Sequence, residues 1–273
     1  MILRTLAANG KTLGRHGVRV PPGGKARRAI RQALRDRGGD LLPGTLPPRL
    51  QEILGDTSPA RLVLSYEGFL GTYAKVLSPD GIYADAGSRA ASVRAIFAGH
   101  DVAFFLAIRN PASFLPALFE ASSQTDFAAF VAGCDLGRIA WSDPVAQIRD
   151  ACPEVPLTVW CNEDLPLLWP EILRRLAGVD ADLTGREAVL AEILTPEGLA
   201  RLERRLADDP PADDAEWRAL VAELLATSAD PDALAPEIAL PGWTEEVIAD
   251  LTARYEADVA RLAAMDGITF LAP

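Results

Sequence analysis

An unbroken apolar run of seven residues, Val102–Ile108, constrains the fold of this chain more than any other feature. A run of that length is typical of a β-strand covered on both faces, as in a parallel sheet. Asn110 and Pro111 follow it, and these residues are typical of the N-cap and the first position of a helix. The segment therefore predicts a buried strand that turns at once into a helix.

Strands and helices alternate on either side of this run. The pattern predicts further strands at Leu62–Ser65 and Leu157–Trp160, with helical segments between them, which favours an α/β fold with a parallel sheet and right-handed crossovers. From about Gly185 only helical periodicity continues, including a helix over Arg186–Ile193. We expect one domain over 1–273, with an α/β core over 1–184 and a helical part over 185–273.

Charge is distributed unevenly along the 273 residues, which carry a formal net charge of −11. Residues 1–37 hold ten Lys or Arg against one acid, and the remaining residues carry a net charge of −20. This acidity argues against nucleic acid as the main partner. The basic N-terminal part could attract a nucleotide or another anionic ligand, or form a solvated face rich in arginine.

Neither a membrane span nor a secretory signal is recognisable in the sequence, so we expect a cytoplasmic protein. The three cysteines, Cys134, Cys152 and Cys161, show no CxxC spacing. Their number and spacing therefore indicate neither a disulfide framework nor a zinc site, and no metal is expected.

Two strand ends carry the candidate site residues. Arg109 follows the apolar run beside a helix N-terminus, where an anion would meet a guanidinium and free backbone N–H groups. Glu67 ends the strand Leu62–Ser65 before Gly68, where the chain can turn closely around a ligand. It is a candidate general base or, equally, a carboxylate that caps the next segment. Glu163 could pair with Arg109 or face a substrate.

Four segments together carry a family resemblance: Arg61–Gly71 (RLVLSYEGFLG), Asp101–Leu118 (DVAFFLAIRNPASFLPAL), Leu157–Asp164 (LTVWCNED) and Pro241–Pro273. In this order they resemble bacterial sulfotransferase-like proteins, which use the sulfate donor PAPS on a three-layer parallel sheet of the P-loop type. The resemblance implies that Arg109 holds the 3′-phosphate of PAPS and that Glu67 is the base.

The pattern of the family departs at one further donor-binding position. A serine is expected eight residues after the strand-end arginine, and this chain has Ala117 there. Ser113, one turn earlier, is the candidate substitute, so Arg109 and Ser113 are the predicted PAPS-binding residues.

A second departure is at the start of the chain. The family opens with a strand and a phosphate loop of the kind HxGxxKTGTTS, whereas Ile2–Asn9 already resembles the helix after that loop. Either Val18–Val20 or Ile268–Leu271 takes the place of the absent strand, or the natural protein begins upstream, which we favour.

Two functions remain open on the sequence. One is sulfuryl transfer from PAPS to a hydroxyl of a small molecule, carbohydrate or lipid. The other is a degenerate, non-catalytic fold that binds a ligand or a protein. A P-loop kinase is disfavoured, because the chain has no GxxxxGK[ST] motif.

Overall fold

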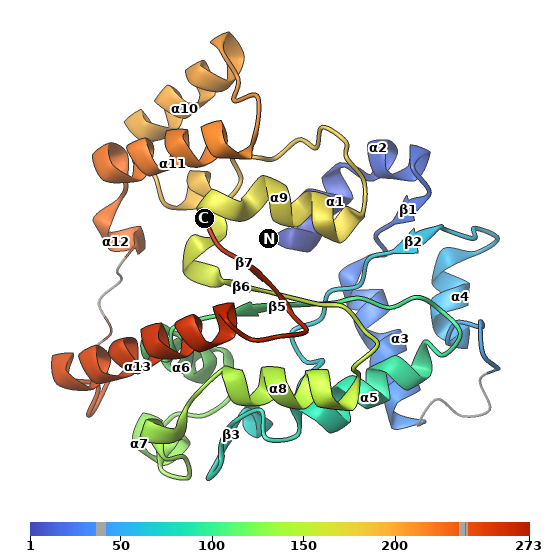
Figure 1. Cartoon of the computed structure of the whole chain (residues 1–273), viewed down its shortest axis with the longest axis horizontal. Coiled ribbons are helices and arrows are strands. Elements are labelled where there is room, and N and C mark those ends of the chain that lie inside the picture. Colours follow the sequence, from blue (N-terminus) through green and yellow to red (C-terminus); the bar gives the residue numbers. More distant parts are fainter. Residues whose placement is uncertain (37–41, 235–237, 239) are drawn as a thin grey trace.

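Strand β6 (Leu157–Cys161) is buried along its whole length and lies at the centre of a three-stranded sheet. It pairs in parallel with β5 (Phe104–Ile108) on one side and with β7 (Thr269–Leu271) on the other. The structure is a computed structural model that describes residues 1–36, 42–234, 238 and 240–273 (Figure 1). The end of the part expected to be helical, 185–273, thus returns to the sheet through a strand within the candidate segment Ile268–Leu271.

Two smaller sheets complete the strands of the described residues. Strand β1 (Val18–Arg19) pairs in parallel with β2 (Arg61–Leu62). Strands β3 (Leu77–Ser78) and β4 (Gly81–Ile82) form an antiparallel hairpin. The fold is therefore mixed α/β with small parallel sheets, and the predicted α/β class is confirmed at that level.

Helices account for most of the remaining regular structure. In chain order they are α1 (Ile2–Ala8), α2 (Gly10–Arg15), α3 (Gly23–Arg35), α4 (Pro48–Leu54), α5 (Ala86–Ile96), α6 (Pro111–Ala121), α7 (Phe127–Val131), α8 (Ser142–Ala151), α9 (Leu165–Ala177), α10 (Pro196–Asp208), α11 (Asp214–Ser228), α12 (Pro231–Leu234) and α13 (Glu245–Ala263). None of the described helices combines the length and hydropathy needed to cross a bilayer.

The predicted helix over Arg186–Ile193 is wrong. This segment forms turns and a single 3-10 turn at Leu190–Glu192. Val189 and Leu190 are both buried but pack into different apolar clusters, Val189 near α9 and Leu190 between α10 and α11. The apolar periodicity of this segment therefore does not come from one buried face of a helix, because its apolar residues pack into two different clusters.

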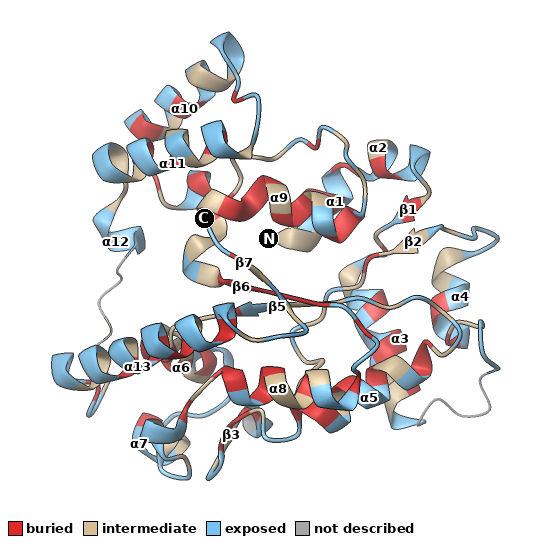
Figure 2. Cartoon of the chain, viewed as in Figure 1, coloured by how far each residue is buried: buried red, intermediate tan, exposed pale blue. Residues whose placement is uncertain are grey.

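Helices cover both faces of the sheet around β6 (Figure 2). On one face, Leu157, Val159 and Cys161 pack with apolar residues of α5, α6, α8 and α13. On the other face, Trp160 packs with residues of α1, α2 and α9. The alternation of strand side chains between the two faces is what divides the core in this way.

Strand β5 is less enclosed than its apolar sequence predicts. It begins at Phe104 rather than Val102, and Ala107 near its middle is exposed. The amide of Phe104 donates to the carbonyl of Pro156 at 2.8 Å, so Phe104, Leu106 and Ile108 turn their backbone groups toward β6. Phe105 and Ala107 turn theirs to the opposite edge, which has no strand partner among the described residues.

Strand β2 also has one edge without a strand partner in the part of the chain that the structure describes. The amides of Arg61 and Val63 donate to the carbonyls of Gly17 and Arg19 at 3.2 and 2.9 Å, so those of Leu62 and Leu64 point away from β1. The two segments considered as substitutes for a first strand lie elsewhere. Val18–Arg19 pairs with β2, and Thr269–Leu271 pairs with β6.

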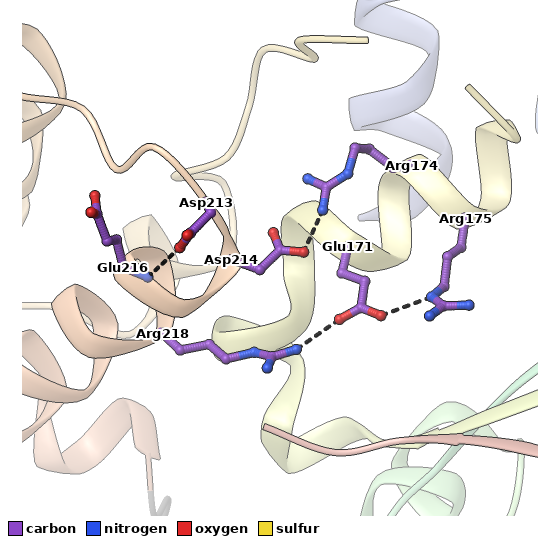
Figure 3. A network of polar contacts seen from close by, with 7 residues as sticks. All are labelled: Glu171, Arg174, Arg175, Asp213, Asp214, Glu216 and Arg218. Carbon is purple, nitrogen blue, oxygen red and sulfur yellow. Dashed lines mark hydrogen bonds and ion pairs between the residues drawn. The ribbon is translucent and has the colours of Figure 1, made fainter. Parts of the chain in front are cut away.

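Polar contacts attach α11 to α9 (Figure 3). Arg174 pairs with Asp214 at 2.5 Å, and Glu171 accepts from Arg175 and Arg218 at 2.8 and 2.7 Å. Beneath them, the fully buried Trp217 donates through Nε1 to the carbonyl of Pro166 at 3.1 Å. Helices α10 and α11 thereby dock on the core through α9.

Candidate functional site

The end of β5 and the first turn of α6 bring Arg109 and Ser113 together. Nε of Arg109 donates to Oγ of Ser113 at 2.9 Å, and this hydroxyl also lies 3.2 Å from the carbonyl oxygen of Asn110, to which it donates. Residues four apart on a helical turn face the same side, which explains the contact. The two residues predicted to bind the donor are therefore in one cluster.

Asn110 is the N-cap of α6, as the sequence predicted. Its Oδ1 accepts from the amide of Ala112 at 2.9 Å, and its carbonyl accepts from the amides of Ser113 and Phe114. The expectation of free helix N–H groups at this site is thus wrong, because Asn110 itself takes them. An anion placed here would meet the arginine, the serine and the positive end of the helix dipole.

The charge of Arg109 is not neutralised within the described part of the chain. None of the ion pairs found there includes this half-buried arginine. A guanidinium with an unengaged edge beside a hydroxyl is suited to a phosphate or carboxylate group.

Glu163 lies beside this cluster, at the end of β6, but does not pair with Arg109. Its Oε1 accepts from the backbone amide of Asn110 at 2.8 Å, and its Oε2 accepts from the hydroxyl of Tyr255 at 3.0 Å. Nδ2 of Asn110 donates to Oγ1 of Thr252 at 3.0 Å. Helix α13 therefore contributes two side chains to the site.

Sequence reasoning missed Thr252 and Tyr255. They lie 142 and 92 residues from their partners Asn110 and Glu163, so no local motif marks them. One signal was present: Tyr255 and Asp258 are spaced to share one side of a helix with Leu251 and Leu262, and this side of α13 is buried. Polar groups repeated on the buried side of a helix indicate specific partners.

Burial keeps the protons on two of these groups. It raises the pKa of the Tyr255 hydroxyl above its usual range, and the neighbouring Cys161 and Glu163 raise it further. Burial also raises the pKa of the Cys161 thiol to about 11, against a lowering effect of the Tyr255 hydroxyl. At neutral pH both groups are protonated, and Tyr255 is a permanent hydrogen-bond donor to Glu163.

A second carboxylate, Asp258 on α13, joins the site to α8. The buried Asp258 accepts from the amides of Trp141 and Ser142 at 2.6 and 3.0 Å, where it caps α8. Nε1 of Trp141 in turn donates to the carbonyl of Arg109 at 2.8 Å. The backbone at Arg109 is thus held by this contact in addition to the contact of Glu163 with Asn110.

Glu67, the predicted base, lies in a different set of contacts. It pairs with Arg27 of α3 at 2.8 Å, and both side chains are about half exposed. A Cβ on Gly68 would lie 2.5 Å from Cζ of Tyr66, so a larger residue at this position would displace the end of that tyrosine side chain. No contact in the described part of the chain joins Glu67 to Arg109 or Ser113.

Two hollows of the surface lie away from these residues. The larger, of about 1050 Å³, is open and lies over α1 and α2, with Lys11, Arg15 and Arg19 in its lining. The smaller, of about 540 Å³, lies between α9 and the segment before α11. No group of metal-ligating side chains occurs among the described residues. The strand-end cluster remains the candidate site because it pairs a cation and a hydroxyl at the carboxyl end of a parallel strand.

Comparison with known proteins assigns no family: no family model, curated protein or solved structure matches the chain.

Proposed function

We propose that this chain is a sulfotransferase-like protein that binds PAPS at the end of β5 and transfers its sulfuryl group to a hydroxyl acceptor. The acceptor would be a small molecule, a carbohydrate or a lipid. The observation that carries the proposal is the contact of Arg109 with Ser113, at the position where the family resemblance places the 3′-phosphate.

The donor phosphate would meet the guanidinium of Arg109 and the hydroxyl of Ser113. Charge-assisted hydrogen bonds from arginine to phosphate are among the strong ones in proteins. Rotation of the Ser113 hydroxyl would convert it from a donor to Asn110 into a donor to the phosphate. The arrangement thus supports anion binding without any rearrangement of the backbone.

In the transfer itself, the acceptor oxygen forms a bond to sulfur while the bond between sulfur and the bridging oxygen of the 5′-phosphate breaks. Adenosine 3′,5′-bisphosphate leaves, and the acceptor proton passes to the carboxylate of Glu67. The Arg27 pair does not forbid this role. Ion pairs between half-exposed side chains contribute only about 0–1 kcal/mol, so a substrate can displace Arg27.

The same proposal includes the three-layer sheet of this family. Val18 and Val63, beside β1 and β2, share an apolar cluster with Trp160 of β6. Leu62 and Leu64 share another with Phe104 of β5. Shared clusters of this kind support β1–β2 and β5–β6–β7 as two parts of one layer, interrupted between β2 and β5.

A non-catalytic binding module is the second candidate. The observation that favours it is the separation of Glu67, which contacts Arg27 instead of the Arg109 cluster in the described residues. This alternative keeps the anion site and gives up the transfer, so binding and turnover must be measured separately.

The anion site is tested by calorimetry with adenosine 3′,5′-bisphosphate. Arg109→Ala should weaken binding by about 10- to 100-fold, the loss expected for hydrogen bonds to a charged group. Ala117→Ser adds a hydroxyl one turn beyond Ser113 and should strengthen binding about five-fold, the effect of one net hydrogen bond.

The matched control is Arg204→Ala, which removes the same charge from an exposed position of α10. It should leave the affinity unchanged. Equal affinities for wild type, Arg109→Ala and Arg204→Ala would contradict the proposed site.

A further inference from the structure

The backbone that presents Arg109 is held by side chains from three other elements. The amide of Asn110 donates to Glu163 after β6, Nδ2 of Asn110 donates to Thr252 on α13, and the carbonyl of Arg109 accepts from Trp141 before α8. Arg109 and Asn110 thus have three hydrogen bonds with side chains of other elements. A fourth, from the amide of Ala112 to Oδ1 of Asn110, caps α6.

Glu163 is the centre of this arrangement, because both of its oxygens are engaged. Oε1 accepts from the Asn110 amide at 2.8 Å, and Oε2 accepts from the Tyr255 hydroxyl at 3.0 Å. Glu163 is itself exposed, so these two contacts are what define the orientation of its carboxylate. Its negative charge is directed at two donors instead of at the guanidinium of Arg109.

Tyr255 is suited to hold the carboxylate. It is only 8% exposed, and burial keeps its hydroxyl protonated. Without this donor, one oxygen of Glu163 would lose its partner beside an anion site. The carboxylate could then turn toward Arg109 and compete with the anion for it.

We propose that Glu163 and Tyr255 are positioning residues of the Arg109 site: they fix the Asn110 backbone and keep the carboxylate away from the guanidinium. The inference rests on the proposed anion site and extends it to residues at the end of β6 and on α13. Neither residue touches the ligand, so each acts through Asn110.

The test uses Tyr255→Phe, which removes the hydroxyl and keeps the ring. Exchange of the Asn110 amide should accelerate several-fold, and the indole N–H resonance of Trp141 should shift because the carbonyl of Arg109 moves. The dissociation constant for adenosine 3′,5′-bisphosphate should rise about five-fold. The Trp141 resonance is assigned with Trp141→Phe.

Tyr83→Phe is the matched control. Tyr83 is a partly buried tyrosine, with a pKa raised by burial to about 12, and its ring lies 5.8 Å from that of Trp141. Its hydroxyl has no contact with Glu163. If Tyr255→Phe changes Asn110 exchange and the Trp141 resonance no more than Tyr83→Phe does, the proposal is overturned.

A second pair of variants separates positioning from general loss of structure. Glu163→Gln keeps an oxygen for the Asn110 amide and should retain most of its protection, whereas Glu163→Ala should lose it. Equal protection in both variants would also overturn the proposal. If wild type binds no adenosine 3′,5′-bisphosphate, the proposed function fails, while the exchange and resonance measurements still decide the positioning role.

Discussion

At the scale of a single residue, Glu67 shows that a place near the end of a strand does not by itself bring a side chain to the candidate site. The predicted strand over Leu62–Ser65 is wrong in its bounds: β2 covers Arg61–Leu62, and Glu67 lies in a turn beyond it. Its contact is Arg27, whose guanidinium carbon also lies 5.4 Å from the centre of the Tyr66 ring. Opposite charge and an aromatic ring together attract the arginine. The role of Glu67 as a base therefore depends on exchange of this local partner for a substrate.

Glu67→Gln tests that role. If Glu67 accepts the acceptor proton, turnover with PAPS should fall by about 10²–10⁴-fold, while the affinity for adenosine 3′,5′-bisphosphate stays nearly constant. Turnover is followed as the transfer of an isotopically labelled sulfuryl group from PAPS to the acceptor. Glu52→Gln, at an exposed position of α4, is the control. A turnover that Glu67→Gln leaves unchanged would remove this residue from the mechanism.

The contacts of single residues also show which parts of the site could be predicted. Arg109 and Ser113 are four residues apart around a turn that Asn110 and Pro111 mark in the sequence, so their contact follows from local geometry. Tyr255 reaches Glu163 across 92 residues. That contact depends on how α13 packs against the sheet, which no spacing in the sequence encodes.

At the scale of elements, β6 has the full burial that the sequence predicted for β5. The longer apolar run belongs to β5, but β6 is the strand that is buried throughout. Apolar sequence indicates that side chains avoid water, and it does not indicate whether both backbone edges are paired. The class of element was predictable, whereas the completeness of its pairing was not.

Amide exchange measures that pairing directly. The amides of Leu106 and Ile108 face β6 and should exchange slowly, whereas those of Phe105 and Ala107 face the open edge of β5 and should exchange at least ten-fold faster. Nuclear magnetic resonance resolves the four positions. Strand β6 is the internal control, since its partners on both sides should protect all its central amides. Uniform protection along β5 would show that its second edge is also paired.

At the scale of the whole molecule, the chain leaves the core after α9 and returns to it. Helices α10 and α11 enclose their own apolar cluster around Trp217, yet α13 packs on α6 and α8, and β7 joins β6. The helical part expected over 185–273 therefore begins and ends in contact with the core. This path favours one cooperative unit over two, as the sequence also predicts.

Denaturation of Trp217→Ala decides between those possibilities. Trp217 is fully buried between α9 and α11, so its loss should lower the free energy of unfolding by about 3–5 kcal/mol. If the chain is one cooperative unit, circular dichroism and tryptophan fluorescence should both report a single transition at a lower denaturant concentration.

Arg174→Ala is the control at the same interface. It removes a partly exposed ion pair, with side chains 28% and 31% exposed, and should cost only about 1 kcal/mol. Two separate transitions in Trp217→Ala would show that α10 and α11 unfold independently and that the single-domain prediction is wrong.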